Sequence, residues 1–146
     1  MKTVVISLSG HLISHDEKNI IDVKFIKAFS RLIRSLPYKF VIIVGGGSIA
    51  REYRDAARAF VARKDILDKV GIAATRLNAA LIYAALSDVA EKKIIMDYTK
   101  PILFKKKVLI GAGWRPGFST DFDAVYIAKM LKVDTVINMT DVDYVY

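Results

Sequence analysis

The sequence contains no cysteine, and this absence removes two classes of protein. Without thiols the chain has neither a disulfide framework nor a thiolate metal site. It has only three prolines, and no apolar run approaches the roughly 20 residues that a membrane-spanning helix needs. We therefore expect a cytoplasmic protein that has no membrane partner.

The chain is instead rich in apolar and basic residues. Hydrophobic residues make up 53% of its 146 residues, which is enough for a sizeable core in one domain spanning residues 1–146. The net charge of +8 favours polyanionic partners such as nucleotides, nucleic acid or a membrane surface. Charge alone does not choose among these partners.

The most informative segment is an apolar run that leads directly into three glycines. Residues 40–44 read Phe-Val-Ile-Ile-Val, glycines occupy 45–47, and a helical pattern begins at Ser48. Glycine permits positive φ and lets a ligand approach the backbone, and the next helix directs its free N–H groups to the same place. Arg51, one turn into that helix, can bind the same anion with two N–H groups. The segment predicts a phosphate site.

Apolar runs and helical patterns alternate along the rest of the chain. The predicted strands are 3–8, 40–44, 107–110 and 135–139. The predicted helices are 22–36, 48–60, 72–86 and 121–131. Helix 72–86 is apolar on nearly every side, and 89–106 is expected to be a surface excursion. This order indicates an α/β fold, a three-layer αβα sandwich with a mostly parallel central sheet.

The helix after the glycines has apolar and basic residues at different spacings. We expect Tyr53 and Phe60 to face the core. Arg51, Arg54 and Arg58 are then expected on another face of the helix.

Four predicted strands end in residues suited to binding ligands. These ends are 9–10, 45–47, 111–113 and 140–141. Parallel strands finish at the same edge of a sheet, so the four ends should converge on a crevice large enough for a polyphosphate. The glycines match neither GxxxxGK[ST] nor GxGxxG, which excludes the P-loop and the dinucleotide fingerprint.

Four segments resemble uridylate kinase, in particular the archaeal-type branch within the amino-acid kinase superfamily. They are 44–53, 71–79, 114–121 and 140–146, and in this order they span almost the whole chain. The resemblance implies an amino-acid kinase-like fold and transfer of the γ-phosphoryl of ATP, bound with Mg²⁺, to UMP in pyrimidine nucleotide biosynthesis. Such a transfer requires positioning and charge neutralisation rather than a nucleophilic side chain.

The resemblance also implies roles for individual residues. Arg51 is the implied catalytic residue, and no metal ligand is implied. The implied UMP-binding residues are Gly46, Asp68, Trp114, Arg115, Pro116, Gly117, Phe118, Ser119 and Thr120. The implied ATP-binding residues are Ser7, Leu8, Ser9, Gly10, His11, Gly47, Arg51, Thr140, Asp141 and Tyr146. In this assignment the three glycines lie between the acceptor phosphate and the group being transferred.

Some of these positions have a second interpretation. Asp68 can be a solvated helix residue, and Trp114 can be a core or interface aromatic. Ser7 stands where many superfamily members have a phosphate-binding lysine, so Arg51 or another basic group must replace that lysine. His11 is interpreted as a neutral residue of the lining with no acid–base role.

Members of the family continue well beyond the position of Tyr146, into a C-terminal lobe that completes the adenine site. We therefore expect residues 1–146 to hold the UMP-binding part and only the start of the ATP-binding part, with the C-terminal part missing and weak activity alone. UMP and ATP are the expected partners, with no nucleic acid, and the family implies a homo-oligomer, either a dimer or a hexamer.

Two alternatives stay open. One is another phosphotransferase of the same superfamily, with a carboxylate, carbamate or isoprenoid phosphate acceptor. The other is a catalytically silent basic domain that binds nucleic acid, whose affinity would fall steeply with salt.

Overall fold

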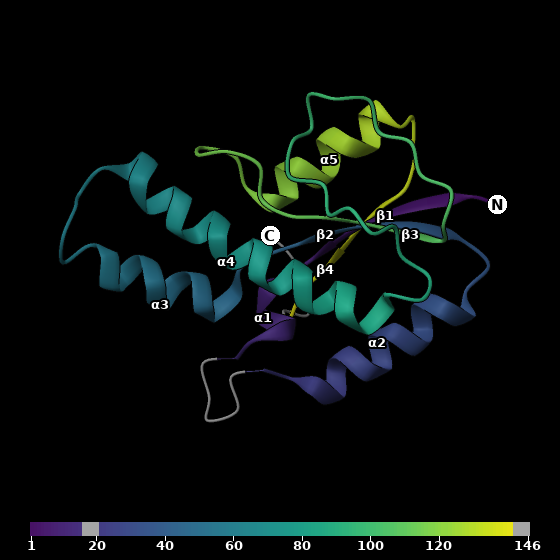
Figure 1. Ribbon diagram of the computed structural model, residues 1–146, viewed down its shortest axis with the longest axis horizontal. Helices are drawn as coiled ribbons and strands as arrows, with labels where there is room; N and C mark the ends of the chain where they lie inside the picture. Colours follow the sequence, from purple (N-terminus) through teal and green to yellow (C-terminus); the bar gives the residue numbers. More distant parts are fainter. Residues whose placement is uncertain (16–20, 142–146) are drawn as a thin grey trace.

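The computed structural model describes residues 1–15 and 21–141, and its centre is a four-stranded parallel sheet (Figure 1). The strands are β1 (Thr3–Leu8), β2 (Lys39–Val44), β3 (Val108–Gly111) and β4 (Val136–Met139). Their spatial order is β3-β2-β1-β4, and Val5 pairs with both Val41 and Val136. The strands lie at the predicted places, within one residue at each end.

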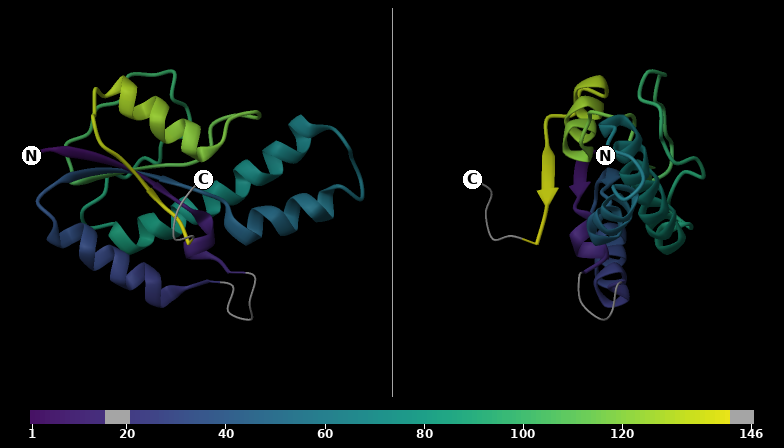
Figure 2. Two further views of the ribbon diagram at one scale, coloured as in Figure 1. Left: turned by 180° about the vertical axis from the view of Figure 1, so that it is seen from behind. Right: turned by 90° about the vertical axis from the view of Figure 1, so that its left-hand side faces the viewer.

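Helices cover both faces of this sheet (Figures 1 and 2). The helices are α1 (Gly10–Ile13), α2 (Val23–Ser35), α3 (Gly47–Ala57), α4 (Lys64–Leu86) and α5 (Thr120–Met130). The α2 and α4 helices pack on one face, and α5 packs on the other. The predicted three-layer αβα architecture is therefore confirmed.

Each face of the sheet buries its own apolar cluster. Ile6 and Ile42 point towards α2 and α4, whereas Val5 and Val41 point towards α5. Adjacent residues of the same strand thus enter different cores, because successive side chains of a strand point to opposite faces. This explains why the central strands β1 and β2 are continuous apolar runs rather than alternating ones.

The α3 helix differs from its prediction. Tyr53 is 65% exposed and Phe60, just after the helix, is 86% exposed, whereas the buried residues of α3 are Ser48 and Ala50. The reason is that α3 and the first half of α4 project from the sheet as a helical hairpin (Figure 1). The predicted apolar face of α3 therefore has no sheet to cover it.

Two further segments depart from the prediction. The α4 helix begins at Lys64, eight residues before the predicted start at 72, because its first turns are charged and hide the apolar pattern. The stretch 89–106 is not wholly a surface excursion, since Tyr98 is fully buried and its hydroxyl donates to the Ala112 carbonyl at 2.7 Å. Backbone bridges from Ala90 and Ile95 to β3 also hold this irregular segment against the sheet.

The turns that follow β1 and β2 meet backbone to backbone. A Cβ atom on Gly10 would lie 2.1 Å from the Gly47 nitrogen, and one on Gly45 would lie 2.9 Å from the Gly10 nitrogen. Gly47 also has a φ of 63°, which residues with a side chain rarely adopt. Only glycine permits this contact, which brings the ends of the two central strands together.

Asp123, in the first turn of α5, is a buried carboxyl group. It is 0% exposed, and neither of its oxygens has a hydrogen-bond partner of normal geometry among the described residues. Burial raises the pKa of Asp123 to about 7, and the backbone amide of Trp114 opposes only part of this rise. The carboxyl group is thus easier to bury in its protonated form.

We predict that Gly10→Ala lowers the free energy of unfolding by on the order of 3 kcal/mol, because the added Cβ must displace the backbone of the neighbouring turn. Urea unfolding measures this change. Gly117→Ala is the control: its φ is 92° but no atom lies within 4 Å of the added Cβ. That variant should lose only about 1 kcal/mol, from backbone strain. Equal losses in the two variants would contradict the close contact.

We predict that Asp123→Asn stabilises the protein at alkaline pH. The pKa of Asp123 is higher in the folded state than in the unfolded state, so stability from this group is present below about pH 4 and is lost as pH rises towards 7. The free energy of unfolding of the variant should therefore exceed that of wild type by on the order of 4 kcal/mol at pH 8, and the gain should vanish near pH 4.

The matched control for Asp123 is Asp88→Asn. The Arg34 guanidinium lowers the pKa of the Asp88 carboxyl, so the charged form is the favoured one there. This variant should show no gain at pH 8. A pH-independent effect of Asp123→Asn would show that burial does not hold the proton.

Candidate functional site

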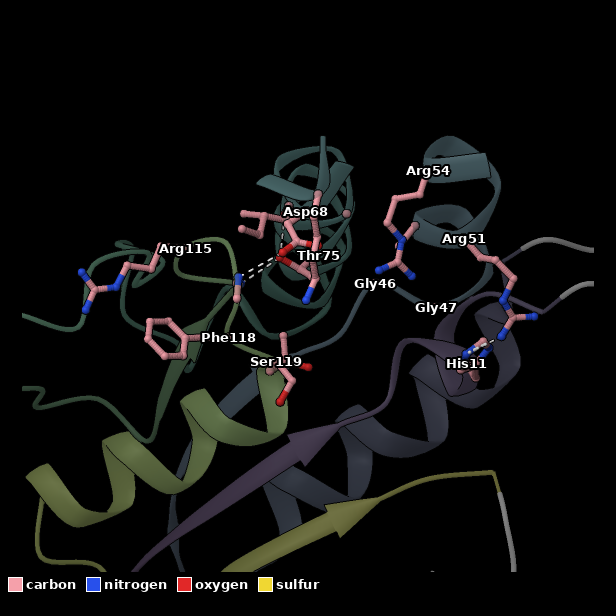
Figure 3. A pocket seen from close by; sticks show the side chains of 17 residues that line it. His11, Gly46, Gly47, Arg51, Arg54, Asp68, Thr75, Arg115, Phe118 and Ser119 are labelled. Carbon is pink, nitrogen blue, oxygen red and sulfur yellow. Dashed lines mark hydrogen bonds between the residues drawn. The ribbon is translucent and has the colours of Figure 1, made fainter. Parts of the chain in front are cut away.

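A pocket of about 370 Å³ opens between the α3–α4 hairpin and the loop that precedes α5 (Figure 3). It lies where β1, β2 and β3 end, as the convergence of parallel strands predicts. Its lining residues are His11, Gly46, Gly47, Ala50, Arg51, Arg54, Lys64, Asp68, Gly71, Ile72, Thr75, Gly113, Arg115, Gly117, Phe118, Ser119 and Thr120.

The lining is strongly basic. Arg51 and Arg54 enter it from α3, Lys64 from the start of α4, and Arg115 from the loop before α5. Asp68 is the one carboxylate among the described lining residues. An excess of cations in a concave site attracts anions and concentrates them there. The pocket is therefore suited to a ligand with more than one negative charge.

Two polar residues of α4 hold the glycine turns in place. The Asn78 amide donates to the carbonyls of Gly45 at 2.9 Å and Gly46 at 3.1 Å. The Thr75 hydroxyl accepts from the Gly113 amide at 2.8 Å, in the turn after β3. Both side chains are at least nine-tenths buried, so these bonds form away from water. Their signal in the sequence is a polar residue on the buried face of an apolar helix.

Asp68 connects α4 to the loop before α5. Its Oδ2 accepts from the Gly117 amide at 3.0 Å, across the pocket entrance (Figure 3). Gly117 has a φ of 92°, which turns its amide towards α4. The structure thus places Asp68 in the pocket wall, not on a purely solvated face of the helix.

Trp114 packs beneath the loop and does not line the pocket. Its ring lies 5.6 Å from Tyr98 and 5.3 Å from Tyr126, measured between centroids, in an aromatic cluster beside α5. The Arg115 guanidinium carbon stacks 4.1 Å above the Trp114 ring and 5.1 Å from that of Phe118. Trp114 is thus partly buried against the apolar cluster beside α5, and Pro116 also lies outside the lining, so their contacts with UMP stay predictions.

Ser119 and Thr120 lie at the start of α5. The Ser119 hydroxyl caps the helix by accepting from the Phe122 amide at 3.1 Å. Both residues line the pocket, as do Gly46, Gly117 and Phe118. Most of the residues predicted on the acceptor side are thus brought together.

Among the described residues predicted to bind ATP, only three line the pocket. His11 and Gly47 line the pocket together with Arg51, and a ring nitrogen of His11 lies 3.3 Å from an Arg51 guanidinium nitrogen. Ser9 accepts from the His11 amide at 3.2 Å and does not reach the pocket. Gly10 contributes through its close contact with the glycine turn rather than as a lining residue.

Other ATP-side predictions fall away from the pocket. The Ser7 hydroxyl donates to an Asp121 oxygen at 2.6 Å, beside α5. The Leu8 side chain is only 1% exposed and packs in the core rather than in the pocket. Thr140 and Asp141 follow β4 outside the lining, and Tyr146 lies outside the described residues.

Sequence reasoning missed three lining residues with polar side chains: Arg54, Lys64 and Thr75. The helical pattern places Arg54 on the same face as Arg51, but the resemblance implies no role for Arg54. Lys64 lies in the turns of α4 that the apolar pattern did not include. The sequence shows that Lys64 is charged, but only the α3–α4 hairpin brings it to the pocket.

The described residues contain no group of three or more His, Cys, Asp or Glu side chains that could hold a metal ion. None of the described helices has both the length and the hydropathy that a membrane span requires.

Comparison with known proteins assigns the family. The model of the amino acid kinase family matches residues 2–146. Uridylate kinase from Archaeoglobus fulgidus is 37% identical over 98% of this chain, and uridylate kinase from Methanoregula boonei is 35% identical over 100% of it. The chain spans 64% and 62% of the length of these two relatives.

Solved structures agree with the fold. The crystal structure of uridylate kinase from Archaeoglobus fulgidus superposes with a TM-score of 0.83 at 35% identity, covering 100% of this chain and 66% of that one. An isopentenyl phosphate kinase gives a TM-score of 0.67 at 18% identity, over 99% of this chain and 75% of that one, and so shows the fold alone. On the family match and these relatives, the chain belongs to the amino acid kinase family.

Proposed function

We propose that this chain forms the acceptor-binding part of a nucleoside monophosphate kinase, which transfers the γ-phosphoryl of ATP to UMP to give UDP. The observation that carries the proposal is the basic pocket at the ends of β1, β2 and β3, where four cationic side chains surround two glycine turns. The likeness to proteins named uridylate kinase supports UMP as the acceptor.

The pocket is chemically suited to a nucleoside monophosphate. Arginine and lysine neutralise a phosphate dianion, and exposed backbone N–H groups of a glycine turn add hydrogen bonds. Asp68 can accept a bond from a sugar hydroxyl with the oxygen that Gly117 does not use. Phe118 and Arg115 offer flat surfaces on which a base can stack.

The transfer itself is proposed to occur at the glycine turn. An oxygen of the UMP phosphate attacks the γ-phosphorus of ATP, and the bond to the leaving ADP breaks as the new bond forms. Arg51, the proposed catalytic residue, neutralises charge on the transferred group, with Gly47 offering its backbone. Mg²⁺ is proposed to arrive on the phosphates of ATP, whose oxygens are the ligands that it prefers.

The donor side of the site is the less complete one. Seven of the predicted ATP contacts lie outside the lining or outside the described residues, and they stay predictions: Ser7, Leu8, Ser9, Gly10, Thr140, Asp141 and Tyr146. A cytoplasmic location and assembly into a dimer or hexamer likewise stay predictions.

We predict that the chain binds UMP and that uridine binds at least roughly tenfold more weakly, because the basic pocket pairs with the phosphate. Isothermal titration with UMP, uridine, isopentenyl phosphate and acetate measures this order. Asp68→Asn should weaken UMP and uridine alike, through the sugar. Asp134→Asn, at an exposed carboxylate outside the pocket, is the control.

An ADP-release assay with UMP and ATP tests the transfer step, and the isolated chain is expected to turn over slowly. If the chain binds isopentenyl phosphate or acetate but not UMP, UMP is not its acceptor, and the chain belongs to a phosphotransferase of the family with another class of acceptor. Binding that collapses with salt for any polyanion, including nucleic acid, would contradict it altogether.

A further inference from the structure

Arg54 is a pocket residue with an unusual environment. It enters from α3, three residues after Arg51, and its Nε is buried without a hydrogen-bond partner among the described residues. A buried guanidinium N–H that makes no bond costs free energy, so it is expected to be satisfied in the functional state. The pocket is the space into which that bond can form.

Other arginines nearby are paired with carboxylates. Arg58, the residue that follows the last turn of α3, forms an ion pair with Asp55. Arg63, before α4, bonds to Asp65 at 2.8 Å. Among the described residues Arg54 has no such carboxylate, although it is the more enclosed side chain. Its counter-charge is therefore expected from a ligand.

The fold makes room for the Arg54 side chain. Its Cδ would lie 3.3 Å from a Cβ at Gly71, and its Nε and Nη1 would each lie 3.5 Å from it. Glycine at this place in α4 thus lets the arginine lie flat against the helix. Gly71 also lies close to the glycine turn, since its carbonyl oxygen would be 3.5 Å from a Cβ on Gly46. Arg54 and the glycine turn therefore share one corner of the pocket.

The two arginines of α3 serve different ends of the pocket. Figure 3 shows Arg51 extending towards His11, while the Arg54 guanidinium points down towards Gly46, between α3 and α4. His11 follows β1, the strand end implied for ATP, whereas Asp68 and Gly117 form the opposite wall. Arg54 lies between these two sides.

We propose that Arg54 determines acceptor specificity: it binds the phosphate group of the acceptor, and so selects phosphomonoesters over carboxylates and carbamates. The inference rests on the proposed function, because it assigns a residue to the acceptor of that reaction. A phosphate dianion can accept two N–H bonds from the guanidinium, and its two negative charges match the several cations of the lining. A carboxylate carries only one negative charge, so part of the positive charge of the lining stays uncompensated.

The test is isothermal titration of the 146-residue chain with UMP, uridine and inorganic pyrophosphate. Arg54→Gln should weaken UMP binding roughly tenfold to a hundredfold and leave uridine within about twofold of wild type, because only the phosphate contact is lost. Arg54→Lys keeps the stem and the charge and should recover part of the loss. Arg58→Gln is the matched control, since this arginine caps the C-terminal end of the same helix and lies outside the pocket.

Kinetics give a second readout. In the ADP-release assay, Arg54→Gln should raise the KM for UMP while kcat and the KM for ATP change little, whereas Arg51→Gln should lower kcat. This split distinguishes a binding role of Arg54 from general damage to the pocket.

Each outcome bears on a separate claim. Unchanged UMP affinity in Arg54→Gln, or equal losses for UMP and uridine, would overturn the role of Arg54 and leave the UMP kinase proposal intact. Wild-type protein that does not bind UMP but binds pyrophosphate or the phosphomonoester isopentenyl phosphate, with Arg54 required, would overturn UMP as the acceptor and support the phosphate role. If Arg54→Gln does not fold, Arg54→Lys decides by the same ratio of UMP to uridine affinity.

Discussion

The pocket depends on one backbone contact, between Gly10 after β1 and Gly47 after β2. Two chain segments can approach this closely only where neither carries a Cβ atom, and a Cβ on Gly10 would lie 2.1 Å from the Gly47 nitrogen. The contact starts α3 directly above the ends of the central strands. Asn78 then ties the same turn to α4, so three elements meet around an open glycine corner.

The second constraint is the departure of α3 and the first half of α4 from the sheet (Figure 1). The hairpin leaves Tyr53 and Phe60 exposed, but it turns Arg54 inwards and brings Lys64 and Asp68 opposite the loop before α5. A helix packed flat on the sheet would have buried apolar residues and lost this wall. The hairpin thus exposes apolar side chains on its outer face and forms a concave, basic pocket on its inner face.

Much of the fold could be predicted because it follows from local patterns. Continuous apolar runs specify strands that are buried on both faces, and the order of strands and helices implies a parallel sheet. The local pattern predicts the glycine turn and Arg51 as an anion site, the resemblance adds Asp68, and the structure places Gly46, Arg51 and Asp68 in the lining. The resemblance did not indicate that the Leu8 side chain is buried, because this depends on which face of the sheet its strand position points to.

The sequence by itself determined the strands, the glycine turns at their ends, the basic excess and the kinship with uridylate kinases. These are properties of neighbouring residues, and neighbours in the chain stay neighbours in the fold. Only the tertiary structure decided which face of α3 meets α4, that Trp114 packs under the loop, and that Arg54 enters the pocket. Each of these depends on contacts between distant segments, and the helical period alone does not say which partner a face will meet.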